Sequence, residues 1–109
     1  MGVLDDKVAI VTGSARGIGR ATAELLSEHG ANVIINDLDA DLAAQSASEI
    51  AGETAVYGGD LTKEGAPDAL IQTALDAWGK IDIIVNNAGY TLDAPIHNCL
   101  LYTSDAADE

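Results

Sequence analysis

A glycine-rich stretch near the amino terminus has the residue types of a phosphate-binding turn. It reads Thr-Gly-Ser-Ala-Arg-Gly-Ile-Gly over residues 12–19 and follows an apolar run. Glycines let the backbone turn tightly and let a diphosphate approach within hydrogen-bonding distance, and a helix that starts there offers free N–H groups. No Gly-Lys-Ser/Thr follows, so the stretch is not a P-loop. The alternative reading is a turn that only packs tightly.

An aspartate follows at the distance expected for a dinucleotide site. Asp37 ends a second apolar run, 18 residues after Gly19. An acid at about this offset hydrogen-bonds the adenosine ribose hydroxyls, and its charge repels a 2′-phosphate, which favours NAD over NADP. Arg16 argues the other way, because a cation beside the turn could hold a 2′-phosphate. Repulsion between Asp37 and a 2′-phosphate is the more direct effect, so the sequence predicts NAD. The alternative is that Asp37 is a plain turn residue.

Two further polar clusters follow later apolar runs. Asp60 is a candidate acceptor for the adenine amino group, with the backbone of Leu61 alongside; the alternative is a turn residue before a helix. Asn86 and Asn87 have amides that can tie neighbouring strand ends together or meet the cofactor ribose. The small residues 88–89 would leave room for the cofactor.

These residues lie between segments that alternate in character. Unbroken apolar runs rich in β-branched residues predict strands at 7–12, 32–36, 54–57 and 81–85. Apolar residues at helical spacing predict helices at 18–29, 42–50 and 70–78, each followed by a glycine. Such alternation predicts βαβ units and a parallel sheet, whose ligands bind beyond the carboxyl ends of the strands. The polar clusters all fall at those ends, so four strand ends converge on one site.

Composition excludes several classes of protein. The chain has 109 residues and a net charge of −13, with five scattered cations, so it carries no basic stripe for nucleic acid. No apolar run is long enough to cross a bilayer, and the amino terminus has no secretory or myristoylation pattern. One cysteine excludes a disulfide framework and a multi-cysteine metal site. We expect a cytoplasmic chain that binds a small-molecule cofactor, no metal, no nucleic acid and no membrane.

Together the motifs resemble those of the short-chain dehydrogenase/reductase family, in particular its 3-oxoacyl-(acyl-carrier-protein) reductase-like branch. The resemblance rests on residues 12–19, Asp37, Asp60-Leu61 and the Asn-Asn-Ala-Gly of residues 86–89, and covers about residues 3–98. It implies a Rossmann-type three-layer α/β sandwich with a partial parallel sheet in the order 3-2-1-4 and flanking helices. It also implies a homo-oligomer and a cofactor, NAD rather than NADP. Carried over by position, the residues that would bind it are Gly13, Ser14, Arg16, Gly17, Ile18, Gly19, Asp37, Asp60, Leu61, Asn87, Ala88 and Gly89.

The family's proton-transfer residues have no counterpart in this sequence. They are a Tyr with a Lys four residues later, preceded by a Ser, but Tyr57, Tyr90 and Tyr102 are followed at that distance by Leu61, Ala94 and Ala106. We therefore expect residues 1–98 to be a truncated dinucleotide-binding domain without catalytic residues or substrate site. Residues 99–109 resemble translated sequencing-adapter DNA, and we expect them to be a disordered tail.

The resulting prediction is the cofactor-binding part of an NAD(P)-dependent oxidoreductase. The parent enzyme would interconvert a secondary alcohol and a ketone or 3-oxoacyl group, and the chain as given would be inactive. Two alternatives are a non-catalytic dinucleotide-binding module and an S-adenosylmethionine methyltransferase. The methyltransferase also uses a glycine-rich first turn and an acid after the second strand, but it does not need the Asn-Asn-Ala-Gly segment.

Overall fold

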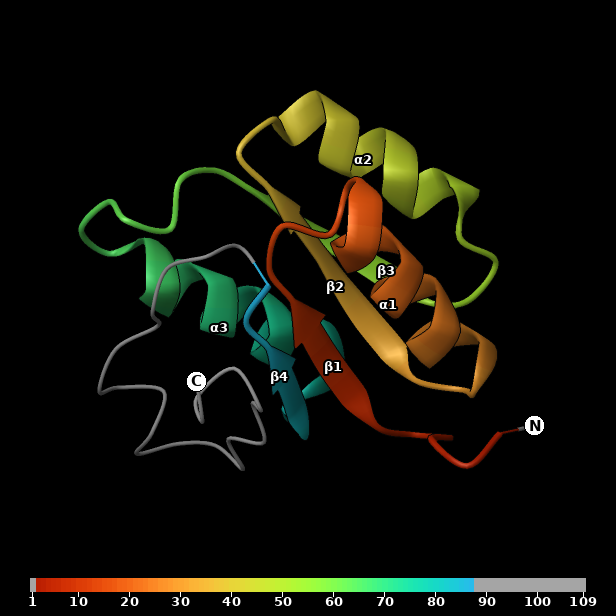
Figure 1. Ribbon diagram of the computed structural model, residues 1–109. Coiled ribbons are helices and arrows are strands. Elements are labelled where there is room, and N and C mark those ends of the chain that lie inside the picture. The colour runs from red at the N-terminus through yellow and green to blue at the C-terminus, as the bar shows by residue number, and fades with distance from the viewer. Residues whose placement is uncertain (1, 88–109) are drawn as a thin grey trace.

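The computed structural model describes residues 2–87 and shows four strands that alternate with three helices. Apolar β-branched runs form the strands and segments with one apolar face form the helices, as the sequence predicted. In chain order (Figure 1) the elements are β1 (Val8–Val11), α1 (Gly17–Glu28), β2 (Asn32–Asp37), α2 (Ala40–Glu49), β3 (Thr54–Gly58), α3 (Ala66–Trp78) and β4 (Ile83–Val85).

All strand pairs are parallel, and the sheet order is β3-β2-β1-β4, which confirms the predicted order. Val11, at the end of β1, is in register with Ile35 of β2 and Val85 of β4. Asp37, the last residue of β2, pairs with Gly58, the last residue of β3. The strands therefore end along one edge of the sheet, and every predicted polar cluster of the described chain follows one of these ends.

Helices cover both faces of the sheet, so the domain has three layers. On one face Val11, Val33 and Ile35 pack with α1 and α2 through Ala23 and Ala43. On the other face, alternate strand residues pack against α3; this second core contains Val8, Ile10, Ile34, Leu61, Ala66, Leu70, Ala74 and Ile84. Figure 1 shows α1 and α2 together and α3 separate from them. Burial on both faces explains why the strands are apolar without alternation.

The last strand is shorter than predicted, because a side chain replaces part of its ladder. Strand β4 begins at Ile83 rather than Ile81. Asp82 Oδ2 accepts the N–H of Val8 at 2.9 Å, while the Asp82 N–H donates to the Val8 carbonyl at 2.8 Å. Burial is the largest influence on the Asp82 pKa and raises it, but the Val8 N–H and the charges of Lys80 and Lys7 together outweigh burial and lower the pKa. The ladder is regular only after Asp82.

Other predictions concern the limits of the described chain. No helix within residues 2–87 is long and apolar enough to cross a membrane. The segment 99–109, interpreted above as a tail, lies outside the described residues. So do Ala88 and Gly89 of the predicted site.

Candidate cofactor-binding site

The turn between β1 and α1 needs glycine at two positions. Gly13 has φ +64° and Gly17 has φ +63°, a left-handed conformation that residues with a Cβ adopt at a cost. Between them, Arg16 has an extended backbone and occupies the N-cap position of α1. The turn therefore leaves β1, reverses over the end of the sheet and enters the helix within five residues, which confirms the predicted strand–turn–helix context of the motif.

A buried asparagine that the sequence analysis did not single out holds the first half of this turn. Asn36 is fully buried, and its Oδ1 accepts the Gly13 N–H at 3.3 Å while its Nδ2 donates to the Tyr57 carbonyl at 2.8 Å. Ser14 is bonded to the Asn36 backbone, since its N–H donates to the Asn36 carbonyl at 2.6 Å and its Oγ accepts the Asn36 N–H at 2.9 Å. Ser14 therefore shapes the turn, with both its N–H and its hydroxyl engaged by β2.

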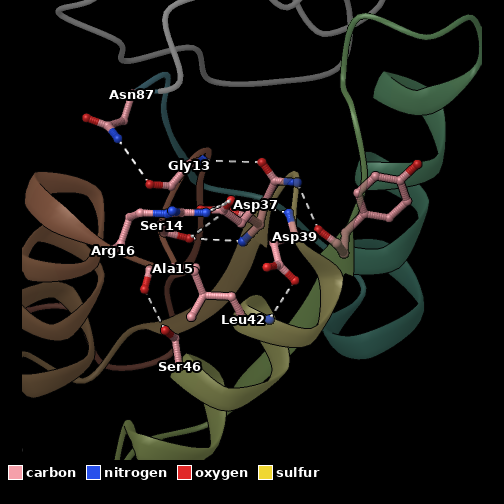
Figure 2. Close-up of polar contacts among 11 residues, drawn as sticks. Gly13, Ser14, Ala15, Arg16, Asp37, Asp39, Leu42, Ser46 and Asn87 are labelled. Carbon is pink, nitrogen blue, oxygen red and sulfur yellow. Dashed lines mark hydrogen bonds and ion pairs between the residues drawn. The ribbon is translucent and has the colours of Figure 1, made fainter.

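The end of β4 braces the turn from the other side. Thr12 Oγ1 donates to Asn86 Oδ1 at 3.3 Å and accepts the Asn87 N–H at 2.9 Å. Asn87 Nδ2 donates to the Gly13 carbonyl at 3.2 Å (Figure 2). Both asparagines thus tie strand ends together, one of the two roles predicted for them. A Cβ on Gly19 would overlap the Gly13 carbonyl oxygen and lie 2.6 Å from Asn87 Nδ2, so this close packing requires glycine.

The start of α1 has free capacity for an anion. No side chain within residues 2–87 caps it, and its first turn contains no acid. The first N–H groups of a helix have no partner in the helix itself and carry the positive end of its dipole. Ile18, in this first turn, is 79% exposed, so solvent reaches the helix start. Exposed N–H groups beside a glycine turn are the arrangement that holds phosphate groups in other proteins.

The structure brings together the two residues that predicted opposite cofactors. Arg16 NH2 lies 3.2 Å from Asp37 Oδ1, with the Asp37 side chain 8% exposed and that of Arg16 66% exposed. The same Asp37 oxygen accepts the Asp39 N–H at 3.4 Å. Asp37 is thereby fixed at the tip of β2, whereas most of the Arg16 side chain faces solvent. A pair this exposed contributes little to stability, so Arg16 can leave Asp37 at small cost.

The two residues after β3 have separate environments. Asp60 Oδ1 accepts the Thr62 Oγ1–H at 2.6 Å and the Thr62 N–H at 2.8 Å, and these bonds lower the Asp60 pKa. Asp60 Oδ1 therefore stabilises the turn before α3, and a contact between Asp60 and the adenine stays a prediction. The Leu61 side chain is buried in the core against α3, so only its backbone is available at the site. Within residues 2–87 no hydrogen bond joins Asp60 to the glycine turn.

Sequence reasoning missed two supports of the turn, Asn36 and Ser46. Ser46, fully buried in α2, donates from Oγ to the Ala15 carbonyl at 2.6 Å. Asn36 is the polar end of an otherwise apolar run, and Ser46 lies on the apolar face of its helix, four residues after Leu42. These positions are signals that could have identified them. The described chain contains no group of three or more metal-ligating side chains, and no metal site was predicted.

Comparisons with known proteins agree on one family. Residues 7–106 match the family model described as short chain dehydrogenase. Sorbitol dehydrogenase of Cereibacter sphaeroides is 45% identical over 93 residues, which are 85% of this chain and 36% of that protein. L-rhamnose 1-dehydrogenase (NAD(P)(+)) of Azotobacter vinelandii is 39% identical over 105 residues, which are 90% of this chain and 40% of that protein.

Solved structures give the same result. A 7α-hydroxysteroid dehydrogenase complexed with NADH and 7-oxo glycochenodeoxycholic acid has a TM-score of 0.76 and 40% identity, over 80% of this chain and 35% of that one. A hydroxysteroid dehydrogenase from Escherichia coli has a TM-score of 0.75 and 40% identity, over 79% of this chain and 36% of that one. The chain thus spans roughly a third of the length of the proteins it matches.

Proposed function

Because this chain belongs to the short-chain dehydrogenase family, whose members bind NAD(P), we propose that the carboxyl ends of its strands bind NAD. The observation that carries the proposal is the pairing of an uncapped helix start on α1 with a carboxylate, Asp37, at the tip of the next strand. The first offers hydrogen-bond donors to a diphosphate, and the second offers an acceptor to ribose hydroxyls.

The diphosphate lies against the start of α1. Gly13 and Gly19 have no side chain to block its approach, and the N–H groups of the first helical turn point to it. The close approach of Gly19 to the Gly13 carbonyl supports this placement, since it keeps the helix start against the turn. The residues assigned to this part are Gly13, Ser14, Arg16, Gly17, Ile18 and Gly19, with Ser14 acting through its bonds to Asn36.

Asp37 binds the adenosine ribose and selects NAD over NADP. Its carboxylate is held by the Asp39 N–H and faces Arg16, so the charge is fixed in place while the cation beside it is exposed. A 2′-phosphate would meet that carboxylate directly, whereas Arg16 only partly offsets the repulsion from a solvated position. NADP is therefore the weaker ligand.

The remaining contacts lie on either side of this centre. Asp60 and the backbone of Leu61, after β3, receive the adenine. Asn87, after β4, lies at the nicotinamide side together with Ala88 and Gly89, which are outside the described residues. Asn87 reaches the Gly13 carbonyl at 3.2 Å, so the nicotinamide and diphosphate parts of the site share a support.

The bound cofactor would supply a hydride acceptor or donor for the interconversion of a secondary alcohol and a ketone. The part played by the residues described above is to bind and orient that cofactor. The family's proton-transfer pair, Tyr-x-x-x-Lys, does not occur in the 109 residues. The chain as given therefore binds the cofactor without turnover, and NADH oxidation with any ketone would contradict this.

The test is a fluorescence titration of the purified chain with NADH and NADPH. We expect NADH to bind more tightly than NADPH. Asp37→Asn should weaken NADH binding and reduce the difference between the NADH and NADPH affinities. Asp41→Asn is the matched control, because Asp41 lies in the exposed first turn of α2 and should leave both affinities unchanged. Binding of S-adenosylmethionine without NADH would favour the methyltransferase alternative and contradict the proposal.

A further inference from the structure

The hydroxyl of Ser46 makes an unusual contact for a serine inside a helix. Such a hydroxyl commonly bonds a carbonyl of its own helix, as Ser48 does with Gln45 at 2.7 Å. Ser46 instead donates to the carbonyl of Ala15, 31 residues earlier in the chain, at 2.6 Å (Figure 2). Both Ser46 and Ala15 are buried, so the contact is shielded from water. A buried hydroxyl without a partner would destabilise the fold, so this bond fixes the distance between α2 and the glycine turn.

An arginine orients the Ser46 hydroxyl. Arg20 NH1 donates to Ser46 Oγ at 3.5 Å, and the same guanidinium pairs with Glu49 at 2.7 Å and Glu24 at 2.9 Å. A guanidinium can only donate hydrogen bonds, so the Ser46 oxygen accepts from it and directs its own hydrogen to Ala15. Bonds to the two glutamates raise the Arg20 pKa, which keeps this donor charged. Arg20 also links α1 to α2, so the helix start and its support form one unit.

The bond determines how the peptide between Ala15 and Arg16 is oriented. In a trans peptide the C=O and N–H point in opposite directions. Because Ser46 holds the Ala15 carbonyl toward α2, the Arg16 N–H points away from α2. The next residue, Gly17, has a left-handed backbone, and a Cβ there would meet no atom within 4 Å, so side-chain packing at Gly17 does not restrain the peptide.

We propose that Ser46 is a positioning residue for the diphosphate of the bound dinucleotide, acting through the Ala15 carbonyl. This inference rests on the proposed function, since it names the residue that keeps the entry to α1 in its binding conformation. Without the hydroxyl, the buried Ala15 carbonyl loses its donor, and the peptide gains by rotating toward water. Rotation would move the N–H groups that face the phosphates and leave the adenosine contacts near Asp37 and Asp60 in place.

The experiment compares Ser46→Ala with Ser48→Ala, the same change two residues away in the same helix. NMR titrations with ADP-ribose, which carries the diphosphate, and adenosine, which lacks it, separate positioning from folding. We expect Ser46→Ala to weaken ADP-ribose binding about fivefold, the equivalent of one hydrogen bond, and to leave adenosine binding unchanged. Ser48→Ala should change neither. A general loss of folded protein would reduce the binding of ADP-ribose and of adenosine equally.

Equal ADP-ribose affinity in the two variants, or an equal loss for adenosine and ADP-ribose, overturns the role of Ser46 while the proposed function stands. A wild-type chain that binds neither ligand contradicts the proposed function and this inference with it. If circular dichroism shows Ser46→Ala unfolded, Ser46→Cys replaces it; the thiol is a weaker donor, so we expect a smaller selective loss, and wild-type affinity would overturn the inference.

Discussion

Helices α1 and α2 start at the same edge of the sheet, after neighbouring strands, yet their first turns are built in opposite ways. Helix α2 is capped by its own Asp39, whose side chain accepts the Leu42 N–H, and Asp41 follows in the first turn. Helix α1 has the cation Arg16 at its N-cap, no capping side chain within the described chain and no acid in its first turn. Helix α2 thus caps one of its first N–H groups with its own side chain, whereas no side chain of the described chain caps α1.

The difference supports the proposed position of the diphosphate at this edge of the sheet. Acids at a helix start stabilise the helix by interacting with its dipole and its free N–H groups. The same acids would repel a phosphate. The acids at the α2 start therefore serve stability, whereas the α1 start is the one to which the proposed function assigns the diphosphate. After β3, Asp60 engages Thr62, so that connection also uses its carboxylate within the protein. Helix α3 also starts without a capping side chain, but Asp68 lies in its first turn, so among the three described helices α1 alone has neither a capping side chain nor an acid at its start.

The largest expected effect comes from adding a Cβ to Gly19, where the start of α1 packs closely against the Gly13 carbonyl. Gly19→Ala places a Cβ against the Gly13 carbonyl, and backbone atoms cannot yield as the end of a side chain can. We expect a loss of about 2 kcal/mol in unfolding free energy, and a loss of about 30-fold in NADH affinity, measured by chemical denaturation and fluorescence titration.

The control for that change is Gly79→Ala at the end of α3. Unlike Gly19, Gly79 has a positive φ, of +78°, and a Cβ there would meet no atom within 4 Å. We expect about 1 kcal/mol of destabilisation from backbone strain and no change in NADH affinity of the folded fraction. An equal loss of affinity in both variants would mean that the packing of Gly19 has no special part in binding.

A second prediction makes the start of α1 resemble that of α2. Ile18→Asp adds an acid to the first turn at an exposed position. We expect the helix to gain up to about 1 kcal/mol from the dipole, whereas NADH binds about tenfold more weakly because the carboxylate repels its diphosphate. Ile18→Asn is the control of similar shape without charge. If thermal unfolding and titration show the two variants to be alike, charge is not what distinguishes the helix starts.

The third prediction removes the cap of α2. Asp39→Ala takes away the acceptor for the Leu42 N–H, so we expect the free energy of unfolding to fall by about 1 kcal/mol. NADH affinity should not change, because the Asp39 N–H that holds Asp37 is retained. Asp39→Asn, which can also cap, should restore most of the stability. A tenfold loss of NADH affinity in Asp39→Ala would show that both helix starts serve the ligand.

The smallest expected effect concerns the third connection and its pH dependence. Thr62 lowers the Asp60 pKa, so its bond stabilises the fold above the unfolded pKa of about 4, and the effect disappears as pH falls through the folded value. Thr62→Ala should raise the Asp60 pKa, as measured by NMR titration. It should also lower the unfolding midpoint slightly at pH 7.

At pH 2 the unfolding midpoints of the wild type and Thr62→Ala should converge. Thr73→Ala is the control, because the Thr73 hydroxyl donates to the Ala69 carbonyl and contacts no carboxylate. A difference between wild type and Thr62→Ala that is as large in acid as at pH 7 would show that the ionised carboxylate is not the source of the effect.

Local sequence was sufficient for the type and order of the elements, although α3 begins at Ala66 rather than at the predicted residue 70. Unbroken apolar runs predicted the strands within two residues, and the offset of Asp37 from Gly19 placed it at a strand tip, where β2 ends. The asparagines after the fourth run were placed correctly for the same reason. Such predictions succeed because a strand that is buried on both faces has an unbroken apolar run, and a tight turn has glycines. Both signals come from residues that are neighbours in the chain.

Local sequence could not show which polar groups meet. Asn36 bonds Gly13 and Tyr57, Ser46 bonds Ala15, and all three contacts join residues more than 20 positions apart. The Arg16–Asp37 pair is of the same kind. In the sequence Asp37 favoured NAD and Arg16 favoured NADP, and only the fold shows that the two side chains lie 3.2 Å apart.

The sequence by itself determined the alternation of strands and helices, the glycines of the first turn and the acid at Asp37, because each depends on residues close together in the chain. Only the tertiary structure decided that Asn36, Ser46 and Asn87 hold that turn from three directions. Hydrogen bonds between distant segments depend on strand order and helix placement, which are fixed only when the layers pack together.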